Sequence, residues 1–198
     1  MLLVSSGGCF KAMSAWAAIA GGNWIEPEYK LTDGPLLILV DDLNNQISEP
    51  GPVRKLHKTL SDIFLEYDVN KRVIPLDSWK ELRQSDKDYD KLAVRQIGEK
   101  LGAEQILYLD VVRFTLYGEP GADIFKGQFT VRVKVLSTRQ QRDVRLWPRQ
   151  ESGKRVVVSM PPEPNDGDRS ASVVAKELSE KLGHEVAKLF YGHRELDD

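Results

Sequence analysis

The stretch from Asp88 to Phe114 constrains the fold more than any other part of the chain. Its first part carries apolar residues at a four-residue spacing, at Ala93, Ile97 and Leu101. This spacing predicts a helix with one apolar stripe. Gly102 follows, and glycine ends helices readily because it adopts the left-handed conformation at little cost. The residues after it, 106–114, are apolar except for Asp110 and Arg113, which predicts a central strand covered on both faces in its first half.

Alternating strand and helix patterns flank this stretch on both sides. The predicted strands are 36–40, 72–76, 106–114 and 129–136, and strand pattern continues through 144–147 and 155–160 around Pro148 and Gly153. Helical spacing marks 52–67, a short segment around Trp79 and Leu82, 88–101, and the region from about 168 to 190. We predict an α/β fold with α+β character in the C-terminal half. It has one mixed five-stranded sheet, with elements in the order β-α-β-α-β-β-β-α.

The length of the chain favours one domain. Its 198 residues can bury one substantial core but not two. We expect residues 1–34 to form a signal or lipobox remnant and tether, 35–191 the mixed-sheet domain, and 192–198 a polar tail.

Positive charge is concentrated in one segment. The whole chain has a net charge of -2, which argues against a general nucleic-acid binder. Between Lys126 and Arg155, however, nine Lys or Arg residues are offset by only two acids. Strand alternation places Arg132 and Lys134 on the face opposite the apolar Val131, Val133 and Val135. We therefore predict a basic face that binds an anionic partner or pairs with the acidic remainder of the chain, formed by Arg132, Lys134, Arg142, Arg145, Arg149 and Arg155.

The single cysteine, Cys9, rules out an internal disulfide and any site built from several cysteines. It follows the small residues Ser6, Gly7 and Gly8, a pattern that resembles a bacterial lipobox, where the cysteine sulfur carries a diacylglyceryl group. A second interpretation is a signal peptide with Lys11 before an apolar region, 12–20, and an A-x-A cleavage site. The third is a cytosolic N-terminus with an incidental cysteine.

The layout resembles two groups of proteins. The joint Leu101-Gly102-Ala103, within strand-helix units that lead to a meander and a final helix, resembles a small mixed-sheet domain. That domain is found in curli-secretion lipoproteins, penicillin-binding-protein activator lipoproteins and the N-terminal part of the Tol-Pal propeller protein. The chain also resembles uncharacterised planctomycete lipoproteins. The shared residues are Phe114, Leu116, Tyr117, Phe125-Lys126-Gly127, Val131, Val133, Val135 and 189–193. Both resemblances imply a cell-envelope protein and neither implies an activity.

Acidic residues at the predicted strand ends are the candidate enzymatic or metal site. Asp41, Asp42, Asn44 and Asp77 follow the first two strands, where open sheets place ligands, and their oxygens could hold a cation. The alternative is turn and cap chemistry, because Asp and Asn bond to their own backbone at such places. His57 is predicted to be a partly buried packing residue, and His184 and His193 lack the partners of a zinc site.

The sequence contains neither a nucleophile elbow nor a phosphate-binding glycine loop, so we predict no cofactor and favour a binding protein over an enzyme. The leading hypothesis is an envelope lipoprotein, anchored through Cys9 and facing the periplasm, that acts as a non-enzymatic adaptor. Its expected partners are the membrane and a protein or acidic envelope component; oligomerisation is compatible with the sequence and nucleic acid is not expected. The alternatives are a soluble enzyme with a site near Asp41, Asp42 and Asp77, and a cytosolic regulatory or RNA-associated domain.

Overall fold

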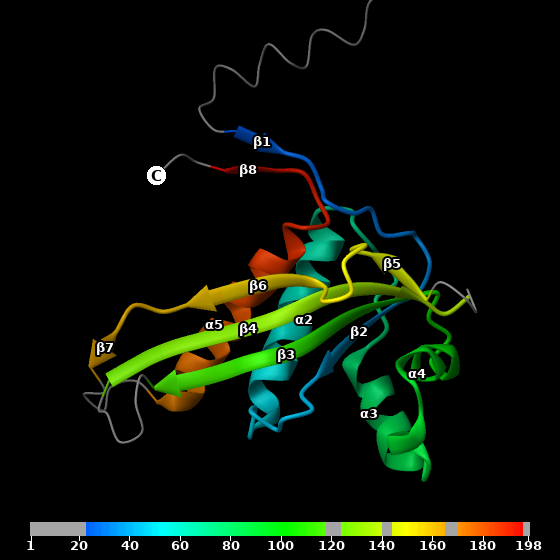
Figure 1. The fold of residues 1–198 in the computed structure, drawn as a ribbon, viewed down its shortest axis with the longest axis horizontal. Helices are drawn as coiled ribbons and strands as arrows, with labels where there is room; N and C mark the ends of the chain where they lie inside the picture. The colour runs from blue at the N-terminus through cyan, green and yellow to red at the C-terminus, as the bar shows by residue number, and fades with distance from the viewer. Residues whose placement is uncertain (1–22, 118–123, 140–143, 165–169, 196–198) are drawn as a thin grey trace, which may run out of the picture.

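The computed structural model describes residues 23–117, 124–139, 144–164 and 170–195 (Figure 1). The helices are α2 (Pro50–Glu66), α3 (Leu76–Ser85), the 3-10 helix η1 (Tyr89–Lys91), α4 (Val94–Lys100) and α5 (Ala171–Ala187). The strands are β1 (Asn23–Ile25), β2 (Leu36–Asp41), β3 (Gln105–Tyr117), β4 (Ile124–Ser137), β5 (Arg145–Trp147), β6 (Lys154–Ser159), β7 (Glu163–Pro164) and β8 (His193–Glu195). Among these described residues, no helix is both long and apolar enough to cross a membrane.

The main sheet is mixed, which confirms the predicted α/β class, and it has six strands instead of five. β2 and β3 run parallel, and β3 pairs antiparallel with the long strand β4. The other edge of β4 pairs in succession with β7, β6 and β5, all antiparallel. The predicted central strand is therefore β3, which lies between β2 and β4. The small strands β1 and β8 form a separate two-stranded sheet.

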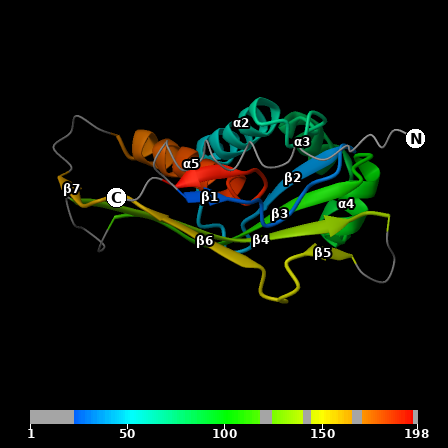
Figure 2. The same ribbon diagram turned by 90° about the horizontal axis from the view of Figure 1, so that it is seen from above.

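The two faces of the sheet are covered differently. Helices α2 and α5 pack together on one face, which we call the inner face (Figure 2). Leu107, Leu109 and Val111 of β3 point into the core there, as does every second residue of β4 from Phe129 to Val135. On the opposite, outer face, a second cluster contains Leu37, Leu39 and Ile106 and is covered by residues of α3 and α4. This cover extends over β2 and the start of β3.

The strand predicted at 72–76 is reduced to one bridge. Val73 pairs with Leu36 in parallel, the Leu36 amide donates to the Arg72 carbonyl, and the Ile74 amide donates to the Leu36 carbonyl. Pro75 has no amide hydrogen with which to continue the ladder, and α3 begins at the next residue. The prediction of a full strand was wrong because the proline stops the pairing after a single step.

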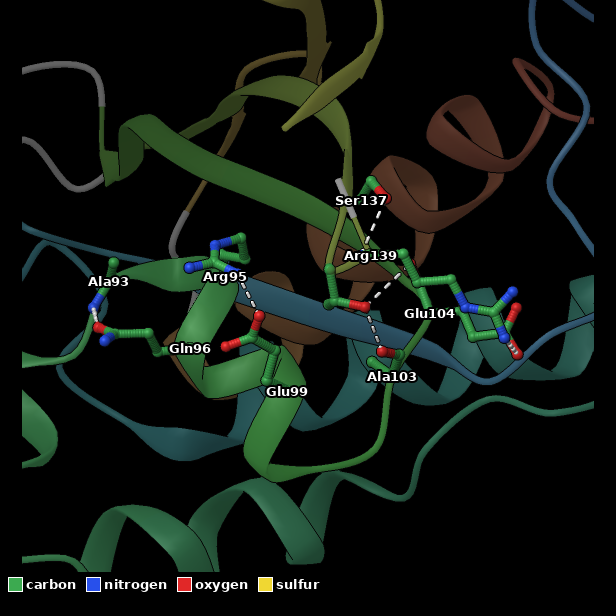
Figure 3. A network of polar contacts seen from close by, with 9 residues as sticks. Ala93, Arg95, Gln96, Glu99, Ala103, Glu104, Ser137 and Arg139 are labelled. Atoms are coloured by element: carbon green, nitrogen blue, oxygen red, sulfur yellow. Dashed lines mark hydrogen bonds and ion pairs between the residues drawn. The ribbon is translucent and has the colours of Figure 1, made fainter. Parts of the chain in front are cut away.

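The helix predicted over 88–101 is divided into two shorter pieces, η1 and α4. Ala93 precedes α4 as its N-cap and is exposed, so it does not belong to the predicted apolar stripe. Figure 3 shows its amide donating to the side chain of Gln96, which caps the helix at 2.8 Å. Ile97 is buried as predicted, and Gly102 ends the helix with a φ of 72°. The turn after Gly102 is held by Thr138, whose hydroxyl donates to the Ala103 carbonyl at 2.6 Å.

Part of the predicted tether packs on the domain, as does part of the predicted polar tail. Residues 23–25 pair antiparallel with residues 193–195 as β1 and β8. The indole of Trp24 lies against Gly192, where a larger residue would collide with it. The amides of Glu28 and Tyr29 both donate to the Leu189 carbonyl just after α5. These contacts attach both ends of the described domain to the end of α5.

His57 is buried on α2, with 7% of its surface exposed, in agreement with its predicted packing role. Its Nε2 atom has no hydrogen-bond partner among the described residues. Burial lowers the pKa of His57 below 6.5, and contact with the Ile74 backbone opposes this shift only partly. The folded protein therefore keeps the imidazole neutral at a pH where the unfolded chain takes up a proton.

We expect the free energy of unfolding to decrease as the pH falls from 6.5 toward the lower folded pKa of His57. A folded pKa below the unfolded one means that this contribution is complete above pH 6.5 and is lost on acidification. The His57→Leu variant removes the titrating group, and its urea unfolding at pH 7 and pH 5 should show a smaller decrease, by at most about 1.4 kcal/mol per unit of pKa difference. An equal decrease in both proteins would assign the pH dependence to other groups.

Candidate functional site

The predicted basic residues of the sheet share its outer face. Arg132 on β4 and Arg155 on β6 are register partners, so their side chains leave the sheet side by side. Lys134 lies two residues further along β4 on the same face. Arg145 of β5 is the register partner of Leu136, which places it on this face as well. Arg149 is exposed in the turn before β6, whereas Arg142 and Cys9 lie outside the described residues.

A row of charges crosses the outer face from β2 to β6. In register it runs through Asp41, Asp110, Arg132 and Arg155, so two acids are followed by two bases. Arg132 Nη1 lies 3.7 Å from Asp110 Oδ2, a partly exposed ion pair of the kind that contributes about 0–1 kcal/mol. Lys154, which precedes Arg155 on β6 and points to the inner face, pairs with Glu28 at 2.6 Å. Intramolecular pairing therefore accounts for some of these cations, as one of the two predicted interpretations requires.

The remaining cations of the face are not neutralised in this way. In the part of the chain that the structure describes, Arg155, Lys134, Arg145 and Arg149 have no ion pair. α3 and α4 contribute side chains over the β2 and β3 part of the outer face, and α2 and α5 lie on the other face, so these cations face solvent. We call Arg132, Lys134, Arg145 and Arg155 the basic outer face.

The strand-end acids each have a separate local partner. Asp42 accepts hydrogen bonds from the amides of Gln46 at 3.0 Å and Ile47 at 2.7 Å, which closes the turn after β2. Asp77 is exposed and bonds to Lys80 at 3.0 Å; this bond holds the pKa of Asp77 below its ordinary value. Asp41 accepts a hydrogen bond from the Tyr108 hydroxyl at 2.5 Å. Across the described ranges, no three His, Cys, Asp or Glu residues are grouped so as to hold a metal ion.

A cavity of about 840 Å³ opens beside Asp41 at the carboxyl end of β2. The loop from Asp42 to Glu49, the start of α2, and residues of α3, η1 and α4 form its walls. On one side, Trp79 Nε1 donates to the Tyr89 hydroxyl at 2.6 Å. The Arg83 guanidinium lies 5.8 Å from the Trp79 ring centroid and 5.9 Å from that of Tyr89. Burial raises the pKa of Tyr89, so its hydroxyl stays protonated at neutral pH.

This aromatic cluster was not anticipated from the sequence. Trp79 and Tyr89 lie ten residues apart on separate short helices, and no local spacing pairs them. The only available signal was the presence of large aromatic side chains in segments with weak helical pattern. A hydrolytic mechanism would require a nucleophile beside a base. Ser61 lies 3.4 Å from His57 Nδ1, but its hydroxyl donates to the His57 carbonyl on the same helix, so the pair forms a local helix contact.

Comparison with known proteins identifies no family. No family model and no curated protein matches this chain. Among solved structures, the PelC dodecamer from Paraburkholderia phytofirmans is similar at 12% identity and a TM-score of 0.39, over 85% of this chain and 96% of that one. Lipoprotein GNA1162 from Neisseria meningitidis is similar at 12% identity and a TM-score of 0.41, over 76% of this chain and 96% of that one. The hypothetical protein CT253 from Chlamydia trachomatis is similar at 10% identity and a TM-score of 0.39, over 77% and 93% respectively. These likenesses are loose, and the names describe those proteins.

Proposed function

We propose that this protein is a membrane-tethered lipoprotein of the cell envelope that acts as a non-enzymatic binding or assembly adaptor. In this proposal a lipid on Cys9 holds the domain at the membrane, facing the periplasm. The basic outer face binds an acidic partner there. The proposal rests on this chain's own residues, because structural likenesses with TM-scores of about 0.4 add no weight to it.

The observation that carries the binding function is the uncompensated charge of the basic outer face. Arg155 stands directly opposite Arg132, and only Arg132 has an acid near it among the described residues. Like charges held next to each other across two strands destabilise the sheet unless something neutralises them. An acidic partner on this face would remove that repulsion, and its attraction would steer the encounter.

The tether is supported by the residues around Cys9. Small residues precede it, and no second cysteine is present to pair with it. Residues 10–22 separate Cys9 from β1, and covalent geometry limits this segment to a reach of at most about 45 Å. A lipid at Cys9 would therefore keep the basic outer face close to the membrane surface.

We expect charge reversal of the basic outer face to abolish binding of an acidic probe. The test compares the wild type with Arg132→Glu/Lys134→Glu/Arg155→Glu, using polyglutamate as the probe at low and high salt. The matched control, Arg54→Glu/Lys176→Glu/Lys181→Glu, changes the net charge equally on exposed positions of α2 and α5. The wild type and the control should retain polyglutamate at low salt only, because exposed charges are screened over about 8 Å at physiological ionic strength.

The same experiment includes an arm for the tether. The native protein should enter the detergent phase on phase partitioning and show a lipid mass on Cys9, and Cys9→Ser should stay in the aqueous phase. If the reversed variant kept its fold and retained as much polyglutamate as the wild type, the basic outer face would not be the binding site. If the native protein stayed in the aqueous phase with Cys9 unmodified, the proposed lipid tether would be rejected.

A further inference from the structure

β6 forms an open edge of the main sheet. It pairs with β4 in an unbroken register from Lys154, opposite Val133, to Ser159, opposite Gln128. No described residue pairs with the other side of β6, and Figure 1 shows it as the outermost strand beside β4. Exposed edges in natural proteins are commonly guarded by bulges, by prolines or by inward-pointing charges. Here the ladder is free of bulges and β6 itself contains no proline; its one inward-facing charge, Lys154 at the first position, is paired with Glu28.

The backbone groups on the open side can be assigned from one hydrogen bond. The Met160 amide donates to the Gly127 carbonyl at 2.9 Å, so these two residues form a hydrogen-bonded pair. Antiparallel ladders alternate, and the inward groups therefore belong to every second residue before Met160. The amides and carbonyls of Arg155, Val157 and Ser159 consequently point away from β4. They are unused donors and acceptors within the described sheet.

The side chains of the same three residues lie on the basic outer face. Val156 and Val158 are buried against the core, and the alternation turns Arg155, Val157 and Ser159 outward. Val157 is 45% exposed, so the middle of the strand presents an aliphatic surface to solvent. The edge thus presents free backbone groups, one exposed aliphatic side chain and one unpaired cation in a single row.

We propose that β6 accepts an extended acidic segment of a partner protein as an additional strand. This inference rests on the proposed function and specifies its mode of binding. Backbone groups of the segment bond to those of Arg155, Val157 and Ser159. Every second side chain of the segment then lies on the outer face of the sheet, so an aliphatic residue sits beside Val157 and an acid two residues away sits beside Arg155, with Arg132 one strand further in.

Charge selects this occupant over a second copy of the chain. Two β6 strands paired antiparallel about Val157 would cover both valines, but each Arg155 would then lie opposite Ser159 of the other copy and would still have no acid beside it. An acidic strand provides the same backbone bonds and the missing negative charge. The recognised feature is therefore an aliphatic residue and an acid, two positions apart in an extended segment.

The test measures binding of a labelled short peptide to the full-length chain. The peptide has valine and glutamate in turn at every second position, with threonine between them, as in Val-Thr-Glu-Thr-Val-Thr-Glu. In its isomer each glutamate is exchanged with the threonine before it, so that the acids face the other side at equal charge. Val157→Pro removes an amide that points away from β4, so the β4–β6 ladder is retained while strand addition is blocked. Val157→Thr keeps the amide and serves as the matched variant. Melting curves of all proteins check the fold.

We expect the wild type and Val157→Thr to bind the peptide and Val157→Pro to lose about tenfold or more in affinity, with the isomer bound as weakly. Equal affinity of Val157→Pro and the wild type, or of the peptide and its isomer, would overturn strand addition. If these proteins still retained polyglutamate, the proposed binding function of the basic outer face would be unaffected, and strand addition alone would be rejected. A concentration-dependent dimer that Val157→Pro abolishes, without peptide binding, would show that a second copy occupies the edge and would also overturn the proposal.

Discussion

Leu109→Asp is expected to abolish cooperative folding. Leu109 is fully buried in β3, and its register partners Val40 and Val133 are apolar and buried too. A carboxylate at this point faces the inner core with no cation to pair with. An uncompensated buried charge costs about 3–5 kcal/mol, a large part of the about 5–15 kcal/mol that stabilises a typical domain. Thermal and urea unfolding followed by circular dichroism would show the loss.

Leu109→Met provides the control for this substitution. It keeps an apolar side chain of similar volume, and we expect it to cost less than about 1.5 kcal/mol. A Leu109→Asp protein that melts cooperatively near the wild-type temperature would mean that β3 is not at the centre of the sheet. The position of β3 between β2 and β4 would then have to be abandoned.

Gly183→Val is expected to produce the second large loss of stability. Gly183 lies on α5 where that helix packs against α2. A Cβ atom at this position would approach Thr59 Cγ2 to 2.7 Å and Thr59 Cβ to 2.9 Å, so the two helices would have to separate. Overpacking of this kind costs about 1–3 kcal/mol. For a chain of this length, we expect a fall of about 2–12 °C in melting temperature.

Two further variants distinguish close packing from a general effect of valine in a helix. A Cβ atom at Gly51, near the start of α2, would meet only Lys176 Cε at 3.6 Å, so Gly51→Val should cost much less. Thr59→Ala removes the methyl group that Gly183→Val would strike, and the double variant should recover part of the loss. Equal melting temperatures for Gly51→Val and Gly183→Val would show that the α2–α5 contact is not the cause.

Local patterns predicted the elements whose structure depends on their own residues. The valine alternation of β4 indicated its buried face, because every second side chain of a strand points the same way. Gly102 indicated the end of α4, since the ease with which glycine adopts a positive φ does not depend on distant packing. The mixed sheet followed from the order of these elements. By contrast, the length of the strand around Val73 was set by Pro75, which has no amide hydrogen and stops the pairing although the residues before it have a strand pattern.

Features that depend on distant pairing could not be derived. β1 and β8 have three residues each and are strands only because they pair with one another, although they lie at opposite ends of the described sequence. Among the basic residues, alternation predicted the direction of Arg132 and Lys134. It could not show that Asp110 lies beside Arg132 or that Arg155 stands opposite it, because those facts require the strand register. The Trp79–Tyr89 contact likewise exists only once α3 and η1 are packed.

The pairing of β1 with β8 places the two ends of the described domain next to each other, with Asn23 opposite Glu195. Such a molecule is suited to circular permutation, in which a short linker joins the original ends and the chain is reopened elsewhere. The turn at Ser152 and Gly153 is exposed or half-exposed and precedes β6 directly. Opening the chain there would make β6 the first strand of the permuted protein. Its open edge could then be lengthened or deleted at a chain terminus, without a change in the sequence of α2 or α5.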